Sequence, residues 1–347
     1  MAKETILEPD LPIVDPHHHL WDRVGLADAP PLTAESHPFE RLMRKSPRYL
    51  FHELLADVSS GHNVVATVFL QCGAMYRADG PMALRCVGET EFVNGVAAMS
   101  ASGIYGPFRA CAGIVGQADL TTGDAVTEVL EAHVTAGGGR FRGIRHSASW
   151  DADTAVLGPL SRIPAGLYMD AAFRKGFARL GRMNMSFDAW LLEPQIGELT
   201  DLARAFPETP IVLDHVGTPL GIGSYKGRLQ ERFGAWREAI RALAKCENVF
   251  VKLGGLAMPF AGFPTFMAEP EASSAVLAAE WKPYLETCIE AFGPKRSMFE
   301  SNFPVDFGTC SYATLWNAFK VFAAGYSAAE KTALFSGSAS RFYRLTL

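Results

Sequence analysis

Residues 14–22 read VDPHHHLWD, and this stretch gives the sequence its clearest structural and chemical signal. Its apolar lead-in, residues 13–15, predicts a short β-strand. Because successive side chains of a strand alternate between its two faces, we expect His17 and His19 on one face and His18 on the other. Two imidazoles on one face can hold a divalent cation through neutral ring nitrogens. The alternative is a solvated turn with three surface histidines, but the apolar lead-in and Trp21 favour a site.

Further short runs rich in apolar and β-branched residues predict seven more strands, at residues 64–70, 110–115, 141–145, 185–192, 211–216, 249–253 and 298–303. Amphipathic stretches long enough for a helix lie between most of them, for example residues 122–135, 196–206 and 229–245. Strands that alternate with helices imply a parallel sheet, and eight such strands can close into a (β/α)8 barrel. An open doubly wound sheet is the alternative. Its first strand would usually lead into a glycine-rich turn, where this chain has histidines.

Two long segments interrupt the alternation. Residues 23–50 are rich in proline, alanine and charge, and residues 254–279 contain three prolines and three phenylalanines. In a barrel both would be loops above the carboxyl ends of the strands, where active sites lie. Because aromatic side chains in long loops need a surface to pack on, we expect loops that enclose a substrate rather than plain surface loops.

The overall composition is that of a globular protein with ample apolar material for a core: 347 residues, 48% hydrophobic and 20% charged. A formal net charge of −5 offers no basic field for nucleic acid or an anionic membrane. No apolar run is long enough to cross a bilayer, and residues 1–10 lack the apolar segment of a secretory signal. The six cysteines are scattered without a CxxC pair, which is typical of reduced, buried thiols. We therefore expect a cytoplasmic protein with no nucleic-acid or membrane partner.

The stretch DPHHHLWD at residues 15–22 resembles the amidohydrolase superfamily, whose hallmark is a His-x-His at the end of the first strand. It is most similar to the amidohydrolase-2 branch, which includes sugar-lactone, pyrone-dicarboxylate and sulfomuconolactone hydrolases together with some decarboxylases. The resemblance continues, in the expected order, at RFRGIRH (140–146), FDAW (187–190), LDHVG (213–217) and FESNFP (299–304). It implies one (β/α)8 barrel domain over residues 1–347.

The eighth predicted strand departs from the family pattern, in which a Ser-Asp-Trp-Pro run supplies the aspartate that takes a proton from the attacking water. The matching residue here is Asn302, and an amide cannot act as a base. Asp306, four residues later, or Glu300, two residues earlier on the same face, can supply the carboxylate instead.

The fifth predicted strand also departs from the pattern, because Glu193 stands where relatives often have a histidine before Pro-Gln. A set of His17, His19 and Glu193 resembles the two-histidine-one-carboxylate arrangements that bind zinc and other divalent ions. Glu193 can also serve as the displaced base, or simply begin the next helix, where an acidic residue favours the positive end of the helix dipole. A metal-free variant of the reaction stays open.

Other candidates come from positions at the predicted strand ends. His215 is expected to face the catalytic mouth, where it can bind metal or polarise a carbonyl, and its neighbour Asp214 is expected to be a supporting or structural carboxylate. Guanidinium groups there suit a carboxylate or sulfonate, which makes Arg142 and Arg145 candidates for substrate binding. Further candidates to line the site are Trp21, Gln71 and Lys252.

These features predict a hydrolase that opens a small anionic or sugar-derived lactone, with zinc as the expected cofactor. A metal-dependent nonoxidative decarboxylase on the same fold is one alternative. A barrel that binds a ligand without catalysis is another, supported by Asn302. The sequence leaves the oligomeric state open, with a homo-oligomer as one option.

Overall fold

A computed structural model describes residues 4–26 and 28–346. Its main sheet has eight parallel strands in the order β1-β4-β5-β6-β7-β8-β9-β10. Their bounds are β1 Ile13–His18, β4 Val64–Leu70, β5 Arg109–Gly116, β6 Phe141–Arg145, β7 Ser186–Ala189, β8 Ile211–Leu213, β9 Val249–Leu253 and β10 Ser297–Phe299.

The first and last strands of this sheet meet just beyond their carboxyl ends. The backbone N–H of Asn302 donates to His17 O at 2.8 Å, and that of His19 donates to Phe303 O at 2.7 Å. These contacts bring the sheet around into a nearly closed (β/α)8 barrel, which confirms the fold expected from the sequence. The open doubly wound sheet is therefore wrong.

Three predicted strands extend too far, and in two of them the chain turns sharply soon after the real strand ends. β8 ends at Leu213 since His215 and Val216 adopt left-handed backbone conformations, with φ of 56° and 49°. Asn302, with φ of 53°, likewise lies outside β10, and residues 190–192 follow β7 without strand pairing. The buried apolar residues of these turns mimic strand continuation in the sequence.

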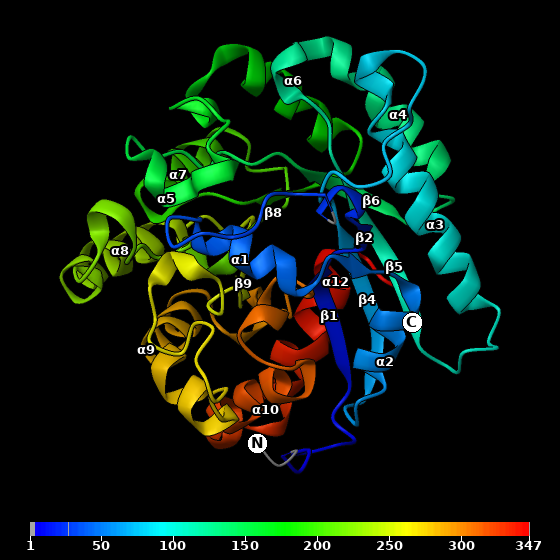
Figure 1. The fold of residues 1–347 in the computed structure, drawn as a ribbon. Coiled ribbons are helices and arrows are strands. Elements are labelled where there is room, and N and C mark those ends of the chain that lie inside the picture. The colour runs from blue at the N-terminus through cyan, green and yellow to red at the C-terminus, as the bar shows by residue number, and fades with distance from the viewer. Residues whose placement is uncertain (1–3, 27, 347) are drawn as a thin grey trace.

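Helices follow the strands and surround the sheet (Figure 1). The predicted helix at 122–135 begins later, because residues 120–125 form a 3-10 segment that is kinked at Gly123, whose φ is 60°, and α4 starts only at Val126. The helix bounds are α1 Pro38–Lys45, α2 Phe51–Val58, α3 Val87–Ala101, α4 Val126–Ala136, α5 Thr154–Leu157, α6 Ala171–Arg182, α7 Ile196–Ala205, α8 Leu229–Leu243, α9 Ser274–Phe292, α10 Tyr312–Phe322, α11 Ala328–Thr332 and α12 Ser338–Phe342.

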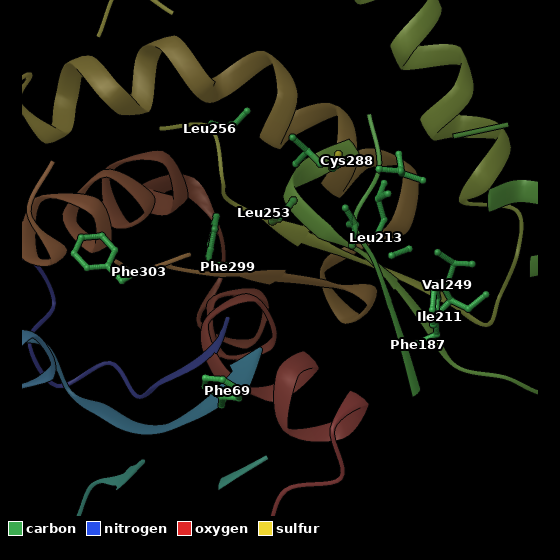
Figure 2. Close-up of a cluster of buried hydrophobic side chains, with 14 of the residues drawn as sticks. Phe69, Phe187, Ile211, Leu213, Val249, Leu253, Leu256, Cys288, Phe299 and Phe303 are labelled. Carbon is green, nitrogen blue, oxygen red and sulfur yellow. The ribbon is translucent and has the colours of Figure 1, made fainter. Parts of the chain in front are cut away.

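Apolar side chains fill both the space between strands and helices and the lower barrel. Figure 2 shows part of the outer layer, where Phe187, Ile211 and Val249 from neighbouring strands lie close together. Inside the barrel, Val14, Val68, Val212 and Met298 form a second cluster with Phe342 and Tyr343 at the C-terminal end of the chain. The charged side chains that matter for the site gather instead near the carboxyl ends of the strands.

The long segment 23–50 lies over those carboxyl ends and contains α1 and β3 (Arg48–Tyr49). β3 pairs antiparallel with β2 (Trp21–Asp22), which directly follows the histidine stretch. Phe39 of α1 packs on Phe260 of the other long segment, with ring centroids 6.1 Å apart. The two segments therefore pack together above the barrel, as expected of enclosing loops, although residues 274–279 belong to α9 rather than to a loop.

Among the described residues, no helix is both long and apolar enough to span a bilayer.

Candidate active site

A cavity of about 710 Å³ opens at the carboxyl ends of the strands. Side chains that follow or end four different strands lie at its floor: His19, Arg145, His215 and Asn302. Trp21 and the segment around α1 form much of its wall. Convergence of polar groups from several strand ends is the arrangement that active sites on this fold use.

His17 lies beneath this floor and is fully buried. Its Nε2 is 3.2 Å from Arg145 Nη1, and its Nδ1 is 2.6 Å from Glu300 Oε2 and 3.2 Å from Lys252 Nζ. Burial lowers the pKa of His17 well below its usual value, and the positive charge of Lys252 lowers it further. His18 points the other way, to Thr67 Oγ1 at 2.9 Å, as the alternation of a strand predicts.

Glu300 joins two imidazoles of the site. Its Oε1 lies 2.7 Å from His215 Nδ1 and also accepts the backbone N–H of His215 at 3.1 Å, while its Oε2 faces His17. A carboxylate accepts hydrogen bonds only, so His215 is expected to present its Nδ1–H to Oε1. His215 then carries its lone pair on Nε2, and its side chain lines the cavity.

Lys252 forms the centre of a buried charge network below the histidines. Its ammonium donates to Asp188 Oδ1 at 2.7 Å and lies 2.9 Å from Asp214 Oδ1, with all three side chains fully buried. Burial raises the pKa of Asp188 to about 6, against the attraction of Lys252. Burial alone would lower the pKa of Lys252, but the charges of Asp188, Asp214 and Glu300 raise it instead. Lys252 therefore stays cationic and holds the carboxylates in place.

Another buried carboxylate, Asp15, fixes the two chain segments that carry the site. It accepts hydrogen bonds from Ser301 Oγ at 2.6 Å, Ser301 N at 3.0 Å and Tyr312 OH at 3.1 Å. Because Ser301 sits between Glu300 and Asn302, these bonds tie β1 to the end of β10 and set the position of both neighbours.

Glycines make room for the pair formed by His215 and Glu300. A Cβ added to Gly255, whose φ is +66°, would collide with the His215 ring, and one added to Gly254 would collide with Glu300. The positive φ of His215 itself is uncommon for a residue with a side chain and is typical of functional sites.

The histidine–carboxylate cluster can hold a metal ion, but with a different ligand set from the one predicted. Ligand atoms of His17, Asp214 and His215 all lie within 4.8 Å of one another. Asp214 Oδ2 accepts no hydrogen bond from the described residues. That oxygen lies 3.8 Å from Arg145 Nη1. Two imidazoles and a carboxylate oxygen are suitable donors for zinc and similar ions. His19 is outside this set, and its Nδ1 lies 2.8 Å from Leu70 O.

Three predicted site residues are not brought to the cavity floor. The carboxylate of Glu193 is paired with Arg232, which corrects its assignment to the metal set. Arg142 donates to Gly139 O and Phe141 O and does not line the cavity, so its assignment to substrate binding is corrected too.

Asp306 is the third of these residues, since it lies behind Asn302, whose Nδ2 donates to its Oδ1 at 2.8 Å. Burial raises its pKa well above the usual value, and the nearby Glu300 adds to the shift. Because a protonated carboxyl cannot accept a proton, Asp306 is poorly suited to act as the base.

Trp21, Gln71 and Arg145 do line the cavity, as expected. Arg145 donates to Gln71 O. Lys252 lies below the cavity rather than in its lining. Asp188 was assigned no role, yet it lies in the same network. A charged residue at an inward position of an otherwise apolar strand is the signal that identifies it, since Phe187 and Ala189 on either side belong to the outer core.

Glu89 of α3 holds the loop after β4 that carries Gln71. Its Oε1 accepts the backbone N–H groups of Cys72 at 3.0 Å and Ala74 at 2.8 Å. Burial raises the pKa of Glu89 from 4.5 to about 7. Between pH 4.5 and about pH 7, the folded protein therefore retains on Glu89 a proton that the unfolded chain has already lost.

We expect the free energy of unfolding to fall by up to about 3 kcal/mol as the pH rises from about 4.5 through about 7, from Glu89 alone. Glu89→Gln keeps an acceptor oxygen for both N–H groups but cannot ionise. Urea denaturation should find this variant more stable than the unmodified protein at about pH 8 and nearly equal to it at about pH 5. Parallel pH profiles of the two proteins would contradict the assignment.

The fold and the site define a (β/α)8 barrel with a histidine–carboxylate centre at its catalytic end. A family model described as Amidohydrolase matches residues 14–345. The chain therefore belongs to the amidohydrolase family, in its amidohydrolase-2 branch.

Individual relatives give more detail. The chain is 34% identical over 345 residues to an uncharacterized protein of Sinorhizobium fredii, covering 97% of this chain and 99% of the relative. It is 29% identical over 239 residues to the L-fucono-1,5-lactonase of Burkholderia multivorans, covering 67% of this chain and 72% of the relative. A solved amidohydrolase of Burkholderia multivorans with bound zinc matches with a TM-score of 0.70 and 25% identity, over 96% of this chain and 99% of that one.

Proposed function

We propose that the protein hydrolyses a small lactone by attack of water on the ring carbonyl. The observation that carries this proposal is the hydrogen bond of 2.7 Å between Glu300 and His215 at the cavity floor. Asn302 replaces the aspartate that usually accepts the proton of the attacking water. The pair formed by His215 and Glu300 supplies a proton acceptor in its place. The similarity to a lactonase supports the choice of ester.

In this proposal His215 Nε2 takes the proton of the attacking water. Glu300 accepts the Nδ1–H bond, which fixes the tautomer and stabilises the imidazolium that forms. The strained backbone of His215 and the space left by Gly255 hold the ring in this orientation. A histidine that acts as a general base and is oriented by a carboxylate recurs on unrelated folds.

Arg145 stabilises the negative charge that develops on the carbonyl oxygen. Its side chain lines the cavity, and its Nε is buried without a hydrogen-bond partner among the described residues. An oriented cation in a site shielded from water contributes far more than it would in solution. Asn302, which also lines the cavity, offers the second hydrogen of its amide and its carbonyl oxygen to position the substrate or the water.

We propose zinc as the ion that His17, Asp214 and His215 would hold. When bound, it supplies a Lewis acid that polarises a carbonyl group and makes water more acidic. His215 belongs to this donor set and is also the proposed general base. It cannot bind a metal ion and accept a proton from water at the same time. Lys252 and Arg145 already place two positive charges within 3.2 Å of His17.

We therefore expect lactone opening to persist, within about threefold, after a chelator has removed bound metal, because the base and the cation for the oxyanion both come from the chain. Rates before and after chelation, with metal content measured by elemental analysis on the same samples, check this. Loss of activity on chelation that zinc alone restores would instead assign the reaction to the metal-bound state.

A panel of sugar-derived and carboxylated lactones, followed by acid release, tests the proposed function. We expect ring opening by the unmodified protein, without carbon dioxide, and its loss in His215→Asn and His17→Ala. Carbon dioxide release from an aromatic acid would favour a decarboxylase. Inactivity of all three proteins towards every lactone would favour a ligand-binding barrel. Six unpaired cysteines support a cytoplasmic location for the reaction.

A further inference from the structure

Arg23 is a cavity residue that the proposed reaction does not use. It follows β2 and lines the cavity wall, with its guanidinium carbon 4.4 Å from the ring centroid of Trp21. Its Nε is buried and has no hydrogen-bond partner among the described residues. None of the ion pairs formed by those residues includes Arg23.

An unpaired, partly buried guanidinium is unfavourable in the absence of a ligand, because burial removes water without supplying an acceptor. Stacking on Trp21 compensates part of that loss and fixes the plane of the guanidinium. A planar donor fork held in a defined orientation is suited to bidentate binding of a carboxylate.

The remaining charges on the cavity lining also favour an anion. Four arginines line it, with Glu40 as the acidic residue among the lining side chains: Arg23, Arg44, Arg145 and Arg162. Arg145 lies at the floor, where its two terminal nitrogens contact His17 and Gln71 O. Arg23 therefore offers a second cationic position, on the wall rather than at the proposed reaction centre.

We propose that Arg23 binds a carboxylate substituent of the substrate, so that the protein selects an anionic lactone over a neutral one. This inference rests on the proposed function and adds the substrate class. The carboxylate lies against Arg23 above Trp21, while the ring carbonyl lies at the floor near Arg145 and His215. The alternative is that Arg23 only packs on Trp21 to stabilise the turn after β2.

Two lactones that differ only in this substituent separate these roles: γ-carboxy-γ-butyrolactone and γ-valerolactone, which has a methyl group in place of the carboxylate. We expect Arg23→Gln to lower kcat/KM for the carboxylated lactone by about 10–100-fold, as for a lost hydrogen bond to a charged group, and to change it less than about threefold for the neutral one. Arg23→Lys should restore only part of the loss, because an ammonium cannot bind in bidentate fashion.

Arg48→Gln is the matched control. Arg48 is exposed and lies opposite Asp22 in the β2–β3 strand pair. The substitution therefore removes the same charge from a neighbouring position outside the cavity. It should leave both lactones unaffected. An equal loss for both lactones in Arg23→Gln, or the same selective loss in Arg48→Gln, would overturn the proposal.

A binding measurement keeps the test independent of catalysis. Glutarate, a dicarboxylate, should quench tryptophan fluorescence of the unmodified protein and bind about 10–100-fold more weakly to Arg23→Gln. If no lactone is opened but this difference in glutarate binding is found, the lactonase proposal fails and the anion site stands. If the unmodified protein neither binds glutarate nor prefers the carboxylated lactone, the anion site is wrong.

Discussion

Replacing Glu300 with glutamine is expected to lower kcat/KM for lactone opening by about 10²–10⁴-fold, the usual contribution of a positioned general base. Glu300 contacts His215 and His17 through its two oxygens. Glutamine is nearly isosteric but carries one oxygen and one NH₂ group, so either His215 Nδ1 or His17 Nδ1 would face an NH₂ group in place of a carboxylate oxygen. One imidazole must then change its tautomer or lose its partner, and the charge that stabilises the imidazolium is gone.

The fold should survive this substitution, since only one atom changes in a cluster that retains Asp188, Asp214 and Lys252. Circular dichroism and the urea midpoint check that point alongside the kinetics. Glu280→Gln is a suitable control, because Glu280 is a half-buried glutamate of α9 that contacts Thr265 away from the site, and it should retain activity within about twofold. If Glu300→Gln opened lactones at the rate of the unmodified protein, Glu300 would have no part in the reaction.

Replacing Lys252 with methionine is expected to lower the free energy of unfolding by about 3–5 kcal/mol, as when one partner of a buried ion pair is removed. The ammonium is fully buried between Asp188 and Asp214, and its loss leaves two carboxylates without a counter-charge. Because these carboxylates can be neutralised by protonation, the loss should be larger at about pH 8 than at about pH 5. Urea denaturation at the two pH values measures it.

The second substitution in Lys252→Met/Asp188→Asn removes one unpaired charge and should recover part of the stability. Lys175→Met is the exposed counterpart, since Lys175 pairs with Asp124 at 2.8 Å on the surface, and it should change stability by less than about 1 kcal/mol. Equal effects of Lys252→Met and Lys175→Met would show that the buried network does not hold the site together.

The barrel could be predicted from the sequence because its strands are short apolar runs separated by amphipathic helices. The sequence also indicated where to look for a site, since His17 lies near the end of β1 and His19 directly follows it. Strand ends were less predictable: the left-handed backbone at His215 and Asn302 lies inside stretches, 211–216 and 298–303, whose sequence predicts a strand throughout. No periodicity in the sequence reports such a turn.

Which carboxylate serves the histidines could not be predicted, because it depends on contacts between distant segments. Glu193 was a reasonable ligand by its place in the motif, but Arg232 of α8 takes its carboxylate. Asp306 was a reasonable base by its distance along the chain, but burial behind Asn302 favours its protonated form. The sequence offered Glu300 only as one of several candidate carboxylates, and the structure places both His17 and His215 beside it.

Product analysis in heavy-oxygen water tests the central claim most directly. The unmodified protein should convert a carboxylated lactone into its open hydroxy acid, with one labelled oxygen in the new carboxyl group and no carbon dioxide, and Glu300→Gln should not. Release of carbon dioxide, or an open acid formed equally well by both proteins, would contradict a lactonase that depends on the pair formed by His215 and Glu300.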